Sequence, residues 1–143
     1  MKLLAVLQNQ WFHDPSRVRE ILARRPELRR QFCHRALFAG CKTGQVLKSV
    51  FGPLCREIVW ENASPQIGDF AASKFPADLL HLRAALDELK PDIVLAFGRI
   101  AGNALTALVP AEKLIIGPHP TARGADVLPR LGSGSVWKKS QTL

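Results

Sequence analysis

Several short apolar runs of the sequence are followed within a few positions by polar side chains: Gln8 and Asn9, Asn62 and Ser64, Arg99, and His119 and Thr121. An Asn amide offers a donor and an acceptor side by side, so it can read the edge of a flat polar ring. A histidine can donate a hydrogen bond to an oxyanion that develops during a reaction. Basic and hydroxyl side chains suit phosphate oxygens. These residue types predict a site that binds a polar ring and stabilises negative charge.

The elements that must position these residues alternate between strands and helices. Apolar runs predict strands at Leu3–Leu7, Glu57–Trp60, Asp92–Phe97 and Lys113–Ile116. Helical spacing, with Pro and Gly at the ends, predicts helices after Asp14, from Pro26 to Phe32, and at Thr43–Phe51, Pro76–Lys90 and Ile100–Leu108. This alternation favours an α/β fold in which helices cover both faces of a four-stranded, mostly parallel sheet, giving three αβα layers.

In open parallel sheets, ligands bind outside the carboxyl ends of the strands. That rule selects the loops Gln8–Phe12, Asn62–Ser64, Gly98–Arg99 and Gly117–Thr121. The polar residues listed above all belong to these four loops. We therefore expect them to lie at one edge of the sheet, where they can form one site.

The positive charge of the chain is concentrated in one stretch. The chain carries a formal net charge of +8. Residues 16–56 hold ten basic side chains against only Glu20 and Glu27; the basic ones are Arg17, Arg19, Arg24, Arg25, Arg29, Arg30, Arg35, Lys42, Lys48 and Arg56. A concentrated basic segment suits a polyanionic partner, most simply nucleic acid, and the alternative is a solvated face that keeps the protein in solution.

The bulk composition narrows the class of protein. A chain of 143 residues suits one domain, which we place at residues 1–131 with a polar tail at 132–143. No apolar run approaches the roughly 20 residues of a membrane span, so no membrane partner is expected. Three cysteines without CxxC spacing argue against disulfides and against a metal site, and indicate a reducing compartment. We expect a cytoplasmic monomer.

The ordered motifs resemble the uracil-DNA glycosylase superfamily over roughly residues 3–125. The five segments that carry this resemblance are, in chain order, Leu7-Gln8-Asn9-Gln10, Leu37-Phe38-Ala39-Gly40 with Gly44 and Leu47, Val59-Trp60-Glu61-Asn62-Ala63, the run from Lys90 to Ala101, and His119-Pro120-Thr121. They are similar to the family's catalytic acid or amide motif, its stacking Phe segment, its base-reading Asn, its Lys-Pro-strand-Gly run and its His-Pro-Ser motif.

The resemblance implies a uracil-DNA glycosylase-like fold and a role for each matched residue. Asn9 would position the attacking water and His119 would stabilise the departing base, while Gln8, Phe38 and Asn62 would contact a base flipped out of DNA. The DNA itself, duplex or single-stranded, would be held by Ser64, Arg99, Thr121 and Arg123. The reaction would be hydrolytic removal of uracil or a related damaged or modified pyrimidine, with neither cofactor nor metal.

Departures from the family pattern keep other functions open. Leu7 and Gln10 stand where the family has Gly and Pro, and Asn9 stands at the position of the catalytic Asp. A poorer general base predicts slow chemistry, or a DNA-binding and base-sensing module of the same fold that has no activity. Asn9 and Asn62 could instead cap turns, and Phe38 could be core. A nucleotide or nucleoside enzyme is a third possibility, although no Gly-rich phosphate loop is present.

Overall fold

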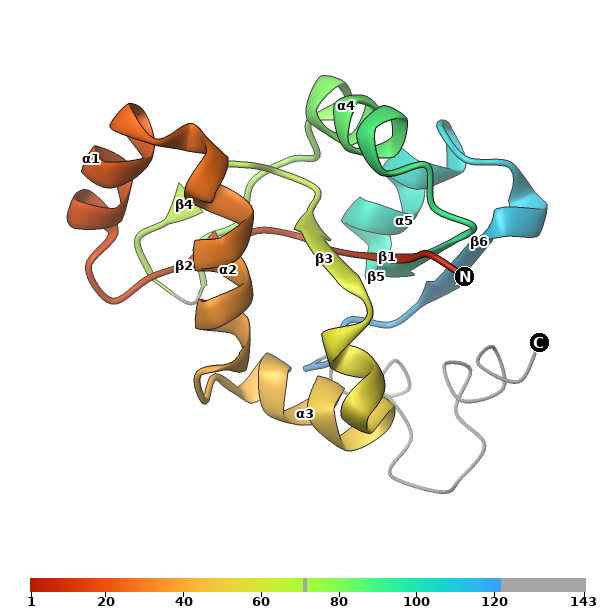
Figure 1. Cartoon of the computed structure of the whole chain (residues 1–143), viewed down its shortest axis with the longest axis horizontal. Coiled ribbons are helices and arrows are strands. Elements are labelled where there is room, and N and C mark those ends of the chain that lie inside the picture. The colour runs from red at the N-terminus through yellow and green to blue at the C-terminus, as the bar shows by residue number, and fades with distance from the viewer. Residues whose placement is uncertain (71, 122–143) are drawn as a thin grey trace.

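The computed structural model describes residues 1–70 and 72–121 of the chain (Figure 1). The polar tail predicted at 132–143 and the DNA-binding role predicted for Arg123 lie outside the described residues. Within the described ranges, none of the helices combines the length and apolar character needed to cross a lipid bilayer.

The centre of the fold is a parallel sheet of four strands in the order β3-β1-β5-β6. Its strands are β1 (Leu3–Leu7), β3 (Val59–Asn62), β5 (Ile93–Phe97) and β6 (Leu114–Gly117). Strand β1 lies inside the sheet and pairs Leu4 with both Val59 of β3 and Val94 of β5. The runs of β1 and β5 are almost wholly apolar because both of their faces are buried. The predicted four-stranded sheet is confirmed, and all four of its strands are parallel.

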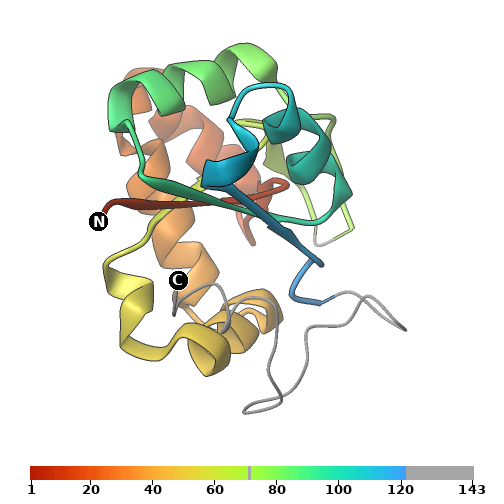
Figure 2. The same cartoon turned by 90° about the vertical axis from the view of Figure 1, so that its right-hand side faces the viewer.

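Helices cover both faces of this sheet, which gives the three layers expected from the sequence. Helices α2 (Arg29–Phe38) and α3 (Lys42–Phe51) lie on one face, and α4 (Leu79–Leu89) and α5 (Arg99–Thr106) lie on the other (Figure 2). Alternate residues of β1 point to the two cores, so that Ala5 joins the α2–α3 side while Leu4 and Val6 join the α4–α5 side. The period of two along the strand therefore produces two separate apolar cores.

A second sheet, which the sequence did not predict, consists of only two short strands. Strand β2 (Gln10–Trp11), which lies inside the predicted loop Gln8–Phe12, pairs in parallel with β4 (Ile67–Gly68). Helix α1 (Pro15–Arg24) lies beside β4, and Arg19 on this helix donates a hydrogen bond of 2.6 Å to Ile67 O. This sheet ties the segment after β1 to the segment after β3.

The helix ends follow the chemistry of their capping residues. The Asp14 side chain accepts a hydrogen bond from the Arg17 N–H, and Asp78 caps α4 through the His81 N–H. Lys90 ends α4 in the left-handed conformation at φ 46°. The predicted helix at Pro76–Lys90 is therefore shorter than expected, because its first turn begins only after Asp78.

The helix predicted from Pro26 to Phe32 runs instead from Arg29 to Phe38, and the boundaries predicted for β3 are also wrong. The sequence placed this strand at Glu57–Trp60, whereas it runs from Val59 to Asn62. A 3-10 helix, η2 (Gly52–Arg56), continues the chain beyond α3 and delays the start of the strand. Asn62 is consequently the last residue of β3 rather than the first residue of a loop.

Helices α2 and α3 approach each other very closely at Gly44. A Cβ atom added to Gly44 would lie 1.7 Å from the carbonyl oxygen of Leu37. The Cys41 side chain sits at the same junction, where its thiol donates a hydrogen bond to Leu37 O at 3.1 Å. The turn between these helices therefore requires a glycine at position 44 for steric reasons.

Candidate functional site

A pocket of about 500 Å³ opens at the carboxyl ends of β1, β5 and β6. It brings together five of the nine residues predicted from the sequence: Gln8, Asn9, Arg99, His119 and Thr121. They come from three segments that are distant along the chain and that meet because parallel strands end at the same edge of the sheet. Ser73 and Lys74, from the connection between β4 and α4, complete the wall and were not predicted.

His119 is held in the pocket by its neighbour Thr121. Its Nδ1 atom accepts a hydrogen bond from the Thr121 N–H at 3.2 Å and lies 3.0 Å from the Thr121 hydroxyl oxygen. A ring nitrogen that accepts from a backbone N–H carries no proton, so the neutral ring of His119 has its proton on Nε2. Burial lowers the pKa of His119, and the positive charge of Lys74 lowers it further. The arrangement favours a neutral imidazole whose Nε2–H is a donor.

Gly98 allows the chain after β5 to turn close beside the end of β6. Its φ of +90° is a conformation that residues with a side chain rarely adopt, and its N–H donates to Gly117 O at 2.8 Å. A Cβ atom at this position would lie 3.6 Å from the Cβ of His119. The turn from β5 into α5 therefore passes directly beside the histidine.

The side chain of Asn9 bonds to the backbone on the far side of the pocket. Its Nδ2 donates to Ser73 O at 3.1 Å, and its Oδ1 accepts from the Phe75 N–H at 3.3 Å. Gln8 adds a third hydrogen bond, from Nε2 to Phe75 O at 3.4 Å. Both polar atoms of the Asn9 amide are thus used to hold the 73–75 segment. A water-positioning role for Asn9 stays a prediction.

Asn62 and Phe38, the other two predicted base contacts, do not line this pocket. Asn62 is buried and borders a separate cavity of about 10 Å³ beneath α2, which is room for about one water molecule. The half-buried Phe38 ring packs against Trp60, with the ring centroids 5.3 Å apart, and Lys48 Nζ lies 5.8 Å from its centroid. The structure therefore separates these two side chains from His119.

Ser64, predicted to bind DNA, is 1% exposed. Its hydroxyl oxygen accepts a hydrogen bond from the Gln66 N–H at 3.2 Å, and its own N–H donates to Gln8 O at 2.9 Å. These bonds stabilise the connection after β3. Ser64 is therefore a buried residue that helps to position Gln8.

Glu61 is a buried ionisable residue for which no role was expected from the sequence. Its side chain is fully buried on β3, and its carboxylate lies 2.8 Å from Arg29 Nη2, 3.2 Å from Arg30 Nε and 3.1 Å from His81 Nε2. Burial acts to raise the pKa of Glu61, but hydrogen bonds from His81 and the Asn62 N–H and the charge of Arg29 lower it to about 2. The carboxylate thus joins α2, β3 and α4.

One signal for this cluster was present in the sequence. An acidic residue in the otherwise buried run Val59–Ala63 must find cationic partners, because an unpaired buried carboxylate is costly. The partners themselves could not be identified, since they lie on two helices that are remote in the chain.

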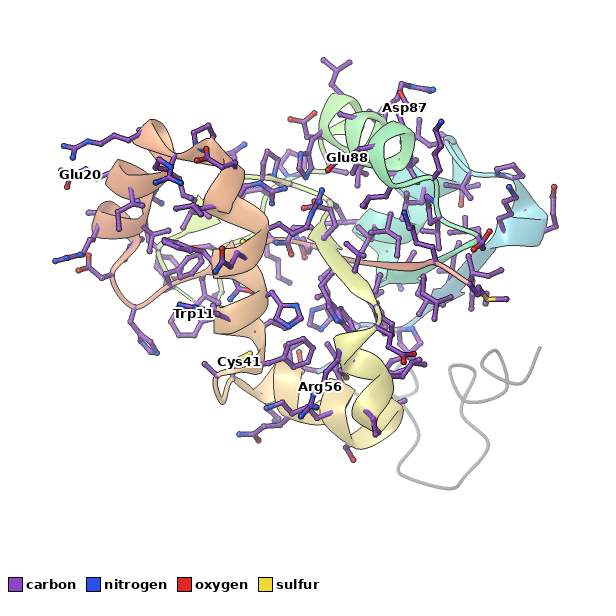
Figure 3. The ribbon with its side chains drawn as sticks, viewed as in Figure 1. Trp11, Glu20, Cys41, Arg56, Asp87 and Glu88 are labelled. Carbon is purple, nitrogen blue, oxygen red and sulfur yellow. The ribbon has the colours of Figure 1, made fainter. Side chains whose placement is uncertain are left out.

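Ion pairs also reduce the free charge of the basic segment. Five of its ten basic residues pair with carboxylates: Arg19 with Asp69, Arg24 with Glu20, Arg25 with Glu27, Arg29 with Glu61, and Arg30 with Glu61 and Glu88. Figure 3 shows Glu20 on the outside of α1 and Glu88 on α4. The pairs of Arg29 and Arg30 with Glu61 are largely buried and serve the fold, whereas those of Arg19, Arg24 and Arg25 are exposed and weak.

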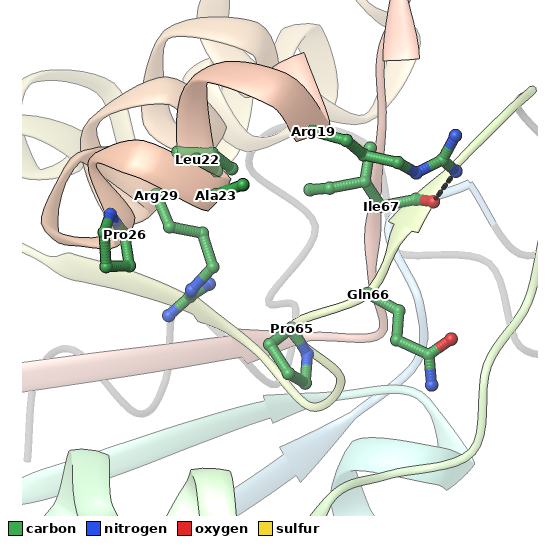
Figure 4. A pocket seen from close by; sticks show the side chains of 8 residues that line it. All are labelled: Arg19, Leu22, Ala23, Pro26, Arg29, Pro65, Gln66 and Ile67. Carbon is green, nitrogen blue, oxygen red and sulfur yellow. Dashed lines mark hydrogen bonds between the residues drawn. The ribbon is translucent and has the colours of Figure 1, made fainter. Parts of the chain in front are cut away.

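A second pocket, of about 450 Å³, lies between α1 and the connection from β3 to β4 (Figure 4). Arg19 and Arg29 both line it, but Arg19 bonds to Ile67 O and Arg29 to Glu61. Arg29 makes this ion pair through Nη2, whereas its Nη1 is buried without a described hydrogen-bond partner. We assign no ligand to this pocket. Within the described ranges, no three His, Cys, Asp or Glu side chains are grouped so that they could hold a metal ion.

Comparison of the chain with protein families, with curated proteins and with solved structures finds no match. The function must therefore be inferred from the site itself.

Proposed function

We propose that this protein is a DNA glycosylase of the uracil-DNA glycosylase type, which removes uracil or a related pyrimidine from DNA, duplex or single-stranded. The observation that carries the proposal is the meeting of Gln8, Asn9, Arg99, His119 and Thr121 in one pocket at the strand ends. These residues were selected from the sequence for this chemistry, and they come from three separate segments. We further propose that the protein acts as a monomer on cytoplasmic DNA.

His119 would carry the main electrostatic contribution to catalysis. When the bond between the sugar C1′ and the base nitrogen breaks, its electron pair leaves with the base and negative charge develops on the pyrimidine O2. The contacts of Nδ1 with Thr121 favour a neutral imidazole that carries its proton on Nε2. This Nε2–H group can donate a hydrogen bond to the pyrimidine O2. Water then adds to the oxocarbenium-like sugar and releases a proton to solvent.

The lining of the pocket also indicates how fast this reaction can be. Among the described residues that line it, none is a carboxylate that could act as a strong general base. On this proposal water adds without a strong general base from these residues, and we expect slow turnover. The separate cavity at Asn62 must widen before that residue can read a base, because it has room for only about one water molecule.

The proposal is tested by incubating the protein with labelled DNA that holds one uracil, opposite G, opposite A or in a single strand. Alkali then converts each abasic site into a strand break. We expect breaks with the wild type and a rate about 100-fold to 1,000-fold lower with His119→Ala, the usual effect of removing one oxyanion donor. The matched control is His13→Ala, since His13 is exposed and does not line the pocket.

A base-sensing module without activity is the second candidate, and one specific observation favours it. Both polar atoms of the Asn9 amide bond to the 73–75 segment, which leaves the usual water-activating position occupied by a structural contact. Tight binding of uracil-containing DNA by the wild type, with no strand breaks, would select this candidate. Absence of both binding and breaks would reject both.

A further inference from the structure

The pocket receives positive charge from two different segments of the chain. Lys74 reaches it from the connection between β4 and α4, and Arg99 reaches it from the first turn of α5. Among the described lining residues none is acidic, so neither cation is neutralised by a carboxylate in the pocket wall. Gly98, which directly precedes α5, has no side chain to cap the helix. The amide N–H groups of the first turn of α5 therefore add partial positive charge.

Lys74 is an exposed residue in a long connection, yet its backbone is fixed on both sides. Asn9 bonds to Ser73 O before it and to the Phe75 N–H after it, and Gln8 bonds to Phe75 O. A lysine side chain loses much rotamer freedom when it binds a ligand, and a fixed backbone limits the additional cost. The three hydrogen bonds thus explain how a surface lysine can be kept at the pocket.

We propose that Lys74 is a phosphate-binding residue of this pocket and that Gln8 and Asn9 are positioning residues that hold it there. The ligand chemistry is a phosphate group, which on the proposed function comes from the DNA backbone beside the extruded nucleotide. Asn9 then acts through Lys74. The positive charge of Lys74 also lowers the pKa of His119, which agrees with both side chains lining the same pocket.

The Lys74 contact is tested by the salt dependence of DNA binding. Fluorescence anisotropy with a uracil-containing duplex would measure the dissociation constant over a range of salt concentrations. For Lys74→Gln, we expect the slope of log affinity against log salt to fall by about 0.9, the value for one duplex phosphate contact. Lys74→Arg should restore the slope. Lys113→Gln is the matched control, because Lys113 lies just before the amino end of β6, whereas the pocket opens at the carboxyl ends of the strands.

The positioning role of Asn9 requires a double variant. Asn9→Ala should also reduce the slope, and the pair Asn9→Ala with Lys74→Gln should reduce it no further than Lys74→Gln alone. Additive reductions would show that Asn9 acts independently of Lys74, and would overturn its positioning role. A change in stability alone does not alter the number of phosphates contacted by the folded protein, so the slope separates positioning from folding.

A second arm, titration with deoxyuridine monophosphate, identifies the source of the phosphate. A reduced slope for Lys74→Gln supports the inference even if no uracil is released, in which case only the glycosylase proposal fails. An unchanged slope in a protein that releases uracil overturns the inference alone. Monophosphate binding that is weakened by Lys74→Gln, without DNA binding, supports the phosphate site and rejects DNA as its source. Binding of neither ligand overturns the inference.

Discussion

Removing the charge of Glu61 should destabilise the protein strongly. The substitution Glu61→Gln keeps the shape of the side chain and an acceptor oxygen but leaves Arg29 and Arg30 without their buried countercharge. The effect on Arg29 is aggravated because its Nη1 atom is buried without a described hydrogen-bond partner. Breaking a buried ion pair from one side typically costs about 3–5 kcal/mol.

The magnitude follows independently from the pKa of the carboxyl group. The pKa of Glu61 falls from its usual 4.5 to about 2 in the folded protein. At roughly 1.4 kcal/mol per pKa unit, the ionised form stabilises the fold by about 3 kcal/mol. Since the side chain has no solvent exposure, no discount for screening by water applies. For a domain of this size the loss lowers the melting temperature by about 12 °C.

Urea unfolding followed by circular dichroism measures this loss. Glu20→Gln is the matched control, because Glu20 forms only an exposed pair with Arg24 at 3.3 Å and should contribute less than about 0.5 kcal/mol. A loss of less than about 1 kcal/mol for Glu61→Gln, or one equal to that of the control, would refute the reasoning.

The same carboxyl group sets a dependence on pH. A group whose pKa is lowered by folding stabilises the protein fully above its unfolded pKa, near 4.5, and loses that contribution as the pH falls toward about 2. The difference in stability between wild type and Glu61→Gln should therefore be largest above pH 4.5 and shrink between 4.5 and 2. A difference that stays constant over this interval would contradict the assignment.

Three further outcomes are expected. Asn9→Ala should cost about 1–2 kcal/mol in thermal unfolding, because it removes two hydrogen bonds to the 73–75 segment, and full stability would show that they do not hold in solution. Gly44→Ala should lower the free energy of unfolding by at least about 1–3 kcal/mol, because the new Cβ would lie 1.7 Å from a carbonyl oxygen of α2. The control, Ser49→Ala at an exposed position, should change it by less than about 0.5 kcal/mol. Equal effects of the two substitutions would be inconsistent with the close packing. Lys74→Gln should raise the pKa of His119 in an NMR titration, because it removes a nearby positive charge, and an unchanged pKa would place the lysine too far away.

The sequence predicted the main sheet well because strands buried on both faces are short and almost wholly apolar. The runs at Leu3–Leu7 and Ile93–Phe97 illustrate this. The two-residue strands β2 and β4 could not be predicted, since Gln10–Trp11 and Ile67–Gly68 are too short to show a period of two. The wrong start of β3 came from a 3-10 helix, which has no apolar signature of its own.

The candidate site was predictable only where a strand end specified the position. His119 and Arg99 follow β6 and β5 directly, so the topology alone places them at one edge. Lys74 lies in a connection whose path depends on hydrogen bonds from Asn9, and no local pattern indicates such a return of the chain. The sequence also could not show which cations of the basic segment are paired, because Glu61 lies on β3, far along the chain from Arg29.

The interior position of β1 makes this strand depend on two remote segments of the chain for its hydrogen bonds. Strand β1 obtains one neighbour when Val59 pairs with Leu4, and obtains the other only when Ile93 pairs with Leu3. Until then its Leu3–Leu7 segment keeps one edge of unpaired amide and carbonyl groups on an apolar strand, which another chain could pair with. Because pairing between remote segments is slow, a folding chain exposes this edge until Ile93–Phe97 has paired with it.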